Sequence, residues 1–261
     1  MARSLGRADR VAEAPALEAM LAAWPPLERE RLGDWTLRFS RGFTRRANSV
    51  LPCGDPSAPL ERAVARVEQA YAARALPSCF QLREGHTADG LASLLTGRGY
   101  QPEHPALVLA GPLPDANPDG RVSHRDRPSG EWLETWLAVS RRAEPDALGL
   151  SRAILERVSR PRTFALLHED GHAVAAALGT LSPGWLGLSC LTVREDARRR
   201  GLARAVLGAL AAWARQRGAD RLWLEVEQDN APALQLYRDL CLERVGGYSY
   251  LTAPSSSRTA S

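Results

Sequence analysis

Apolar positions along this chain follow the helical period in some stretches and the strand period in others. The clearest helical stripe has the spacing i, i+3, i+4, i+7, i+8 and i+11, and it consists of Leu202, Ala205, Val206, Ala209, Leu210 and Trp213. This spacing is typical of a helix with one buried face, and Gly218 ends it. By contrast, residues 35–39 alternate between the two faces of a strand.

The same patterns predict the other elements. Helices are expected at residues 11–24, 60–71, 87–98, 132–138, 154–158 and from Asn230 onward. Strands are expected near Arg121 and at residues 47–51, 79–82, 105–110, 163–168, 172–181, 185–193, 222–226 and 244–252. Residues 111–120 have the Pro, Gly, Asp and Asn content of a linker. Strands interspersed with helices indicate an α/β chain, with an α+β mixed sheet in each half.

The two halves of the chain repeat one pattern. When residues 35–100 are moved by 142 positions, Leu60, Arg62, Ala63 and Val64 meet Leu202, Arg204, Ala205 and Val206. Strand, helix, strand and helix then coincide without a gap. We therefore predict two copies of one fold in tandem, with domains at 1–112 and 121–253, a linker at 113–120 and a disordered tail at 254–261.

A basic turn precedes the strongest helix of the second half. It contains Arg198, Arg199, Arg200 and Gly201. A helix N-terminus presents unpaired N–H groups and a partial positive charge, and glycine permits close approach of a ligand. The turn is therefore suited to a pyrophosphate, although an arginine run before a helix is also a common solvated surface.

Two short motifs in register resemble those of the GNAT (general N-acetyltransferase) superfamily. The sequence Arg198-x-x-Gly201-x-Ala203 is similar to its acyl-CoA signature, Q/R-x-x-G-x-G/A. After the strand at 222–226, Asn230-x-x-Ala233-x-x-Leu236-Tyr237 is similar to its N-x-x-A-x-x-L-Y motif. The Gly-aromatic pair that follows in the family is replaced here by Cys241 and Leu242. The resemblance covers residues 121–253.

This resemblance implies a site for acetyl-CoA, with no metal, where the strand ending at Val193 splays from the strand at 222–226. Backbone groups near Leu191 and Val193 would hold the pantetheine arm. The turn and the helix start would hold the pyrophosphate, and Asn230 fits a hydrogen bond to the cofactor or an N-cap. The implied turn residues are Arg198, Arg199, Arg200, Gly201, Leu202, Ala203 and Arg204.

The superfamily transfers the acetyl group by direct attack of an amine in a ternary complex. Tyr237 is then the expected general acid for the leaving thiolate; a tyrosine that only packs its helix is the alternative. Glu225 is the candidate base, acting through water, and an exposed strand carboxylate is an equal interpretation of it. Gly187 stands where some members carry a glutamate.

The first copy lacks the corresponding residues. Pro56 and Pro59 stand opposite Arg198 and Gly201, and proline has no N–H to offer a phosphate. Ala88 and Leu95 replace Asn230 and Tyr237. We therefore expect a degenerate copy that serves structure or acceptor binding. Its polar segment 41–48 supplies three candidate contacts for the acceptor, namely Arg45, Arg46 and Asn48.

Composition narrows the classes of function. The net charge of +4 is small for a nucleic-acid binder, and all 34 basic residues are arginine, which suggests a bacterial genome of high GC content. Four scattered cysteines favour neither a zinc site nor a disulfide scaffold. There is no signal peptide or membrane-spanning stretch in the pattern. We expect a cytoplasmic monomer without a nucleic-acid or membrane partner.

Three functions fit these observations. The leading hypothesis is an acetyl-CoA-dependent N-acetyltransferase acting on a primary amine of a small molecule or a peptide. The second is a non-catalytic acyl-CoA-binding regulator or interaction protein, against which Tyr237 and Asn230 count. In the third, the first copy is a protein-interaction module.

Overall fold

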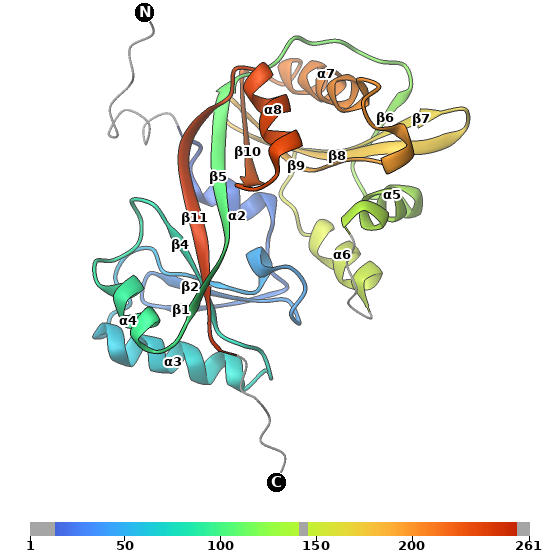
Figure 1. The fold of residues 1–261 in the computed structure, drawn as a ribbon. Helices are drawn as coiled ribbons and strands as arrows, with labels where there is room; N and C mark the ends of the chain where they lie inside the picture. Colours follow the sequence, from blue (N-terminus) through green and yellow to red (C-terminus); the bar gives the residue numbers. More distant parts are fainter. Residues whose placement is uncertain (1–13, 141–145, 255–261) are drawn as a thin grey trace, which may run out of the picture. The chain divides into compact units, whose positions relative to one another are not determined.

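A computed structural model of the chain describes residues 14–140 and 146–254. It divides into two compact units, each built from two stretches of the sequence. The first unit contains residues 108–245 together with the N-terminal segment up to Pro25, and the second contains residues 26–107 together with the C-terminal segment from Gly246. The long strands β5 (Gln101–Pro112) and β11 (Glu243–Thr252) contribute residues to both units (Figure 1).

The second unit is a small mixed sheet with helices α3 (Leu60–Ala72) and α4 (Leu91–Gly97). Its strands follow the order β1-β2-β3-β4-β11-β5. Their bounds are Glu28–Leu32 for β1, Trp35–Phe39 for β2, Val50–Leu51 for β3 and Cys79–Arg83 for β4. β11 runs antiparallel to β4, so the last strand of the chain completes the sheet of this unit.

The core of the second unit comes from the predicted apolar stripes. Val64 and Tyr71 of α3 are fully buried against Trp35, Phe39 and other strand residues. The Tyr71 hydroxyl donates a hydrogen bond of 2.9 Å to the carbonyl oxygen of Arg38. The alternation predicted at residues 35–39 is a strand with these bounds.

The first unit has the strand order β6-β7-β8-β9-β10-β5. The strands span Val122–Arg125 for β6, Arg162–Glu169 for β7, His172–Ser182 for β8, Trp185–Val193 for β9 and Arg221–Glu227 for β10. Neighbours from β6 to β9 are antiparallel, and β9 and β10 are parallel. Helix α7 (Leu202–Arg215) connects this parallel pair.

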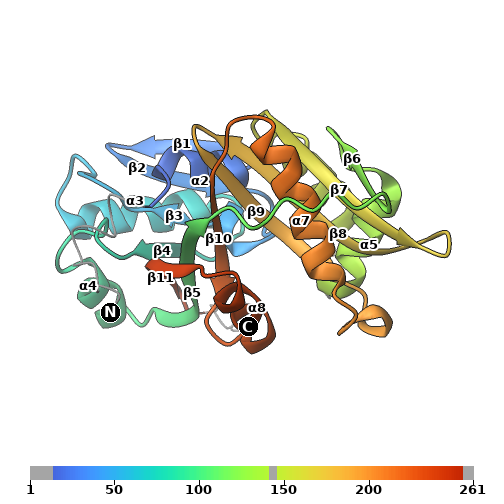
Figure 2. The same cartoon turned by 90° about the horizontal axis from the view of Figure 1, so that it is seen from above.

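Helices cover both faces of this sheet. Helix α7 crosses one face and α5 (Gly130–Ser140) lies on the other, as Figures 1 and 2 show. The remaining helices of the unit are α2 (Leu17–Ala23), α6 (Ala147–Leu155) and α8 (Ala231–Asp239). The buried Trp132 of α5 donates its indole N–H to the carbonyl oxygens of Ala165 and Ala177, so the α5 face is anchored to β7 and β8.

The predicted linker packs against α7 along part of its length. The Asn117 N–H donates to the carbonyl oxygen of Gly208 at 3.2 Å, and a Cβ at Gly208 would come within 3.1 Å of Asn117. The Arg215 guanidinium also donates to the carbonyl oxygens of Leu113 and Pro114. Glycine at position 208 therefore lets the linker pass close to the helix.

Some local predictions need correction. The helix expected at 87–98 begins at Leu91, because Thr87 forms a β-bridge with Cys53 and Gly90 is left-handed, with φ at 81°. Residues 45–47 form the 3₁₀ turn η1 (Arg45–Ala47) before β3. The helix expected at 154–158 is α6, which ends at Leu155.

Other predictions differ in their bounds. The sequence pattern missed β1, because four of its five residues are exposed and charged. The compact units also differ from the predicted segments: α2 belongs with the first unit, and β11 from Gly246 onward belongs with the second. The start of the predicted N-terminal helix and the tail from Ser255 lie outside the described residues.

Three general expectations can be compared with the described residues. The longest helix there is α7, with 14 residues, and none of those helices has the length and apolar character needed to cross a bilayer. The same ranges hold no group of three or more His, Cys, Asp or Glu side chains arranged for a metal ion. All four cysteines are free thiols.

Candidate functional site

The parallel strands β9 and β10 separate partway along their length. They pair from Trp185 and Arg221 as far as Leu188 and Leu224, and both strands continue beyond this point. Within the described ranges, residues 189–193 of β9 have no strand partner on the β10 side. The predicted splay is therefore present, and Leu191 and Val193, both half-buried, lie on it.

A bulge in β9 accompanies this splay. The register of β9 against β8 shifts between Ala176 and Leu178, and Cys190, on the opposite strand, has a φ of 56°. A residue with positive φ is typical of a β-bulge, which bends a strand and redirects its side chains. The bulge was not evident from the sequence, because a cysteine is an uncommon residue in the left-handed region.

The basic turn leads into α7 without a side-chain cap. Gly201 occupies the N-cap position with φ at 78°, and no side chain bonds to the first-turn N–H groups. A Cβ at Gly201 would meet nothing within 4 Å. The N-terminal end of α7 therefore presents its orphan N–H groups toward open space, which is the arrangement that binds anions.

Most arginines around this turn already have carboxylate partners. Arg200 lies 2.9 Å from Glu169 and Arg204 lies 2.7 Å from Asp239. Arg198 is 3.7 Å from Glu195 and donates to the carbonyl oxygen of Val193. Arg199, which is exposed and has a φ of 60°, has no ion-pair partner in the described part of the chain. Leu202 is buried and Ala203 half-buried at the first turn of α7.

Tyr237 lies in α8 with 6% of its surface exposed. No hydrogen-bond partner of its hydroxyl is found among the described residues. Burial raises the pKa of Tyr237 to about 12, so the phenol keeps its proton at neutral pH. The hydroxyl oxygen is not one of the fully buried side-chain atoms that lack a partner in the described residues, so it reaches the protein surface although the ring is buried, and it is available to a ligand.

Glu225 and Asn230 both precede this helix in the chain. The Asn230 side chain accepts a hydrogen bond from the Ala233 N–H at 3.2 Å and caps α8, which confirms the N-cap interpretation. Glu225 is half-buried on β10, one residue beyond the last pair with β9. It shares a strand face with Trp223 and Arg221.

The position of the missing glutamate is closed to any side chain. A Cβ at Gly187 would lie 2.6 Å from the Thr180 hydroxyl and 2.8 Å from ring carbons of Trp223. Trp223 is itself buried. Glycine at this position is thus required by the tryptophan on the neighbouring strand, so no side chain at 187 can serve as a base.

The three candidate acceptor residues belong to the second unit. Arg45 is exposed and pairs with Glu103 at 3.1 Å, and Arg46 is half-buried. Asn48 is buried, and all four of its hydrogen-bonding positions are used by backbone groups of residues 40–44. The structure therefore shows Asn48 holding its own turn. Acceptor contacts by these residues stay a prediction.

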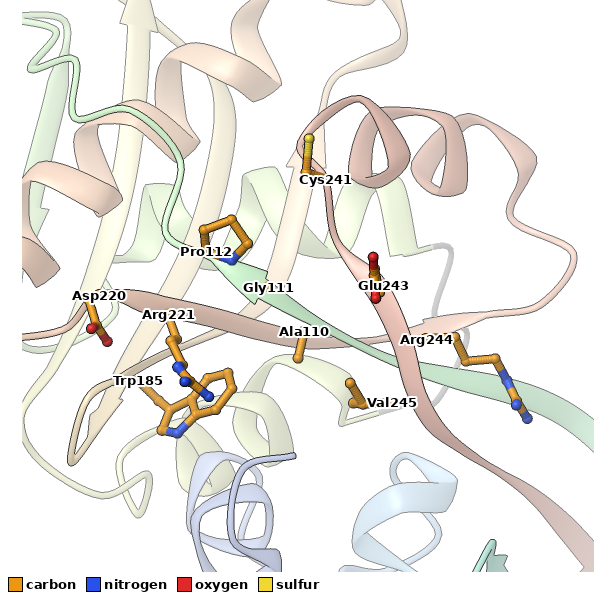
Figure 3. Close-up of a pocket in the computed structure, with 10 residues that line it drawn as sticks. All are labelled: Ala110, Gly111, Pro112, Trp185, Asp220, Arg221, Cys241, Glu243, Arg244 and Val245. Carbon is orange, nitrogen blue, oxygen red and sulfur yellow. The ribbon is translucent and has the colours of Figure 1, made fainter. Parts of the chain in front are cut away.

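A cavity of about 500 Å³ lies elsewhere in the first unit (Figure 3). Its lining comes from the ends of β5, β9, β10 and β11, and consists of Ala110, Gly111, Pro112, Trp185, Asp220, Arg221, Cys241, Glu243, Arg244 and Val245. The Arg221 guanidinium lies 5.3 Å from the centre of the Trp185 ring, whereas Arg244 points away from that pair. None of the predicted site residues lines this cavity, which lies at the beginning of β9 and not at the splayed end.

The basic turn is contacted by Glu169, a residue that the sequence patterns did not identify as part of the site. Its carboxylate lies 2.9 Å from Arg200 and 2.7 Å from Arg121. In the sequence it is one residue of a polar hairpin turn, 31 positions before Arg200. Only the pairing of β7 with β8 and the course of the turn bring these groups together.

Comparison with known proteins places these features in a family. The family model described as "Probable histone acetyltransferase Rv0428c C-terminal" matches residues 12–251. The "Probable histone acetyltransferase Rv0428c" of Mycobacterium tuberculosis is 30% identical over 222 residues, which cover 83% of this chain and 67% of that protein. The "Uncharacterized N-acetyltransferase YobR" of Bacillus subtilis is 25% identical over 236 residues, covering 88% and 94% of the two chains.

The fold is similar to that of solved acetyltransferases. A GCN5-related N-acetyltransferase from Kribbella flavida superposes with a TM-score of 0.65 at 20% identity, and 98% of each chain is covered. The matched family model spans nearly the whole sequence, including residues of both units and the basic turn. The chain therefore belongs to the GNAT superfamily of acetyltransferases and, within it, to the family of the Rv0428c C-terminal region.

Proposed function

We propose that the chain transfers an acetyl group from acetyl-CoA to a primary amine of a small molecule or a peptide, and that the first unit carries the reaction. The observation that carries this proposal is a coincidence in one unit. The splay of β9 from β10, the uncapped N-terminus of α7 and a tyrosine whose ring is buried and whose hydroxyl has no partner among the described residues all occur there.

The turn before α7 would bind the pyrophosphate. The N–H groups from Arg199 to Arg204 provide donors, and the helix end and Arg199 provide positive charge. Leu191 and Val193 would hold the pantetheine arm through backbone groups on the unpaired side of β9. Because Asn230 already caps α8, its amide nitrogen is the group left for the cofactor.

The reaction needs a neutral amine, donors for the oxyanion and a proton for the leaving sulfur. The amine nitrogen attacks the thioester carbon, the C–S bond breaks, and the sulfur takes a proton from the Tyr237 hydroxyl. The amine loses a proton in this step, and a water molecule passes that proton to the Glu225 carboxylate. Because the pKa of Tyr237 is about 12, the donor form is present at every pH at which the protein is assayed.

Release of free CoA in the presence of acetyl-CoA and a panel of amines tests the proposal. The panel should contain small primary amines and lysine peptides, since the Mycobacterium tuberculosis relative is named a probable histone acetyltransferase. We expect turnover that depends on both substrates and follows ternary-complex kinetics. Tight binding of acetyl-CoA without turnover for any amine would favour the non-catalytic regulator.

A further inference from the structure

Four charged side chains link the linker region to the cofactor turn of the first unit, and we call Asp119, Arg121, Glu169 and Arg200 the charge chain. The Arg121 guanidinium donates to both oxygens of Asp119, at 3.1 and 2.8 Å. Its third contact is to Glu169 Oε1 at 2.7 Å. The other oxygen of Glu169 lies 2.9 Å from Arg200 Nη2. One carboxylate therefore bridges two arginines.

Glu169 is the least exposed member of the charge chain. Its side chain is 13% exposed, whereas those of Arg121 and Arg200 are 47% and 55% exposed. An ion pair between exposed groups contributes little to stability, but a largely desolvated carboxylate needs its partners. Arg200 is therefore attracted to the end of β7 by a charge that Arg121 fixes. The contact is an ion pair without hydrogen-bond geometry, because Glu169 Oε2 has no hydrogen-bond partner among the described residues.

The backbone beside Arg200 is one that needs such a constraint. Arg199 and Gly201, its two neighbours, both have positive φ, at 60° and 78°. A left-handed arginine is unfavourable by about 1–2 kcal/mol relative to the right-handed form. Free in solution, the segment would relax and its N–H groups would no longer point in one direction.

We propose that Glu169 is a positioning residue for the cofactor turn. By fixing Arg200 it holds Arg199 and Gly201 in the conformation that presents the α7 N–H groups to the pyrophosphate. Arg200 then connects Glu169 to the backbone of the turn, and Arg199 is the side chain that contacts phosphate directly. This inference rests on the proposed function of the turn.

The alternative is that Glu169 competes with phosphate for Arg200. In that case removal of the carboxylate would release a second arginine to the ligand and tighten its binding. The two explanations predict opposite signs for the same variant. The Arg200 side chain is exposed, so once released from Glu169 it would be solvated by water and would contribute little to phosphate binding. We therefore expect the loss of positioning to outweigh the gain of a second arginine for the ligand.

Calorimetric titration of acetyl-CoA into the full chain tests the inference. Glu169→Gln should raise Kd by about threefold to tenfold, as expected for coupled neighbours. Arg200→Gln should raise it by a similar factor, and the double variant should be no weaker than either single one. In steady state, KM for acetyl-CoA should rise while kcat changes little.

Salt dependence separates positioning from direct contact. Arg199→Gln should weaken binding and also reduce its sensitivity to ionic strength, because it removes a charge that meets phosphate. Glu169→Gln should leave that sensitivity nearly unchanged. Asp196→Asn is the matched control: it neutralises an exposed carboxylate beside the same turn, 2.8 Å from Arg194, and should leave Kd unchanged.

The outcomes are distinguishable. If the wild-type chain does not bind acetyl-CoA, the proposed function fails. If it binds and Glu169→Gln binds equally well or more tightly, or if the two single effects add, the inference is wrong while the function stands. A thermal melt of each variant shows whether weaker binding of acetyl-CoA reflects general unfolding. If it does, the Kd values of Asp196→Asn and Glu169→Gln are compared at a temperature at which both variants are folded to the same extent.

Discussion

The turns before α3 and α7 share one left-handed position and differ at the N-cap and in their chemistry. The two helices begin at Leu60 and Leu202, positions that coincide when the copies are superimposed in sequence. Ser57 and Arg199, again equivalent, have φ values of 56° and 60°. The next equivalent pair differs: Pro59 has a φ of −53°, and Gly201 has a φ of 78°.

This comparison separates what the fold requires from what a ligand requires. The left-handed residue two positions before the N-cap occurs in both turns, so it does not by itself distinguish a ligand-binding turn. Of these two turns, only the basic one has glycine at the N-cap. Pro59 is fixed near its φ by its ring and lacks an N–H, so the turn before α3 cannot present the same donors.

The segments that follow the strands before these helices also differ between the two units. In the second unit, Cys53 and Thr87 form a β-bridge between the segments that follow β3 and β4. Their equivalents in the first unit, Glu195 and Asp229, are exposed and form no bridge among the described residues. The second unit is thus bridged at a position where the first unit has no β-bridge among its described residues.

The largest effect is expected at Tyr237, whose equivalent in the first copy is the fully buried Leu95. Tyr237→Phe should lower kcat by about 100-fold or more, the lower end of general acid–base contributions, with acetyl-CoA affinity nearly unchanged. Because the pKa is about 12, this residue should cause no fall in rate below pH 10 or so. A pH–rate profile with an amine that gives turnover measures both.

Tyr71→Phe is the matched control from the other copy. Its hydroxyl bonds to the carbonyl oxygen of Arg38, so its loss should cost about 0.5–1.5 kcal/mol of stability and leave kcat unchanged. The Tyr237 hydroxyl has no such partner among the described residues, so Tyr237→Phe should hardly change the melting temperature. Near-normal turnover of Tyr237→Phe would show that solvent protonates the thiolate.

The next effect concerns the glycine that distinguishes the two turns. Gly201→Val should raise Kd for acetyl-CoA at least tenfold, about 1.4 kcal/mol, because a β-branched residue resists positive φ and fills the space that the phosphate would occupy. Isothermal calorimetry measures this change.

Gly218→Val provides the comparison for strain alone. Gly218 also has a positive φ, at 83°, and a Cβ added there would meet nothing within 4 Å, but it follows the other end of α7. Both variants should lose similar stability, and only Gly201→Val should lose cofactor affinity. Equal affinities would remove the turn from the site.

Periodicity predicted the helices of this fold well where one face is buried, as the bounds of α3 and α7 show. The strands at 35–39 and 185–193 also have the predicted bounds, although all five residues of β2 are buried. Periodicity missed β1, because four of its five residues are exposed and charged and offer no apolar positions from which a period can be recognised. The strand predicted at 47–51 also began too early, because Ala47 is the last residue of the 3₁₀ turn η1.

The candidate site was predictable only as far as its motifs extend. The glycine, the tyrosine and the capping asparagine are positions that short motifs identify. The bridge from Glu169 to Arg200 joins residues 31 positions apart, and the closure of position 187 depends on Trp223 from another strand. Such contacts follow from strand register, which the sequence patterns of single elements do not specify.

A smaller effect is expected from the polar segment 41–48 of the second unit. Arg45→Ala and Arg46→Ala should raise KM for the amine by about fivefold at most, the range of exposed charge contacts, and leave acetyl-CoA affinity unchanged. Asn48→Ala should instead lower stability by about 1–3 kcal/mol, because it leaves buried backbone groups of its turn unpaired. Arg41→Ala, an exposed arginine of the same segment, is the control. Unchanged amine kinetics in both arginine variants would exclude the segment from acceptor binding.

The smallest effect is expected from an attempt to restore the first copy. The wild-type chain should bind one acetyl-CoA, and the double variant Pro56→Arg with Pro59→Gly should still bind one. These changes return the arginine and glycine of the turn, but the Cys53–Thr87 bridge would still join the segments after β3 and β4, and Leu95 would still occupy the position of the tyrosine. Calorimetric stoichiometry measures the result. A second site in the double variant would mean that the two prolines alone distinguish the copies, and two sites in the wild-type chain would mean that the first copy never lost its ligand.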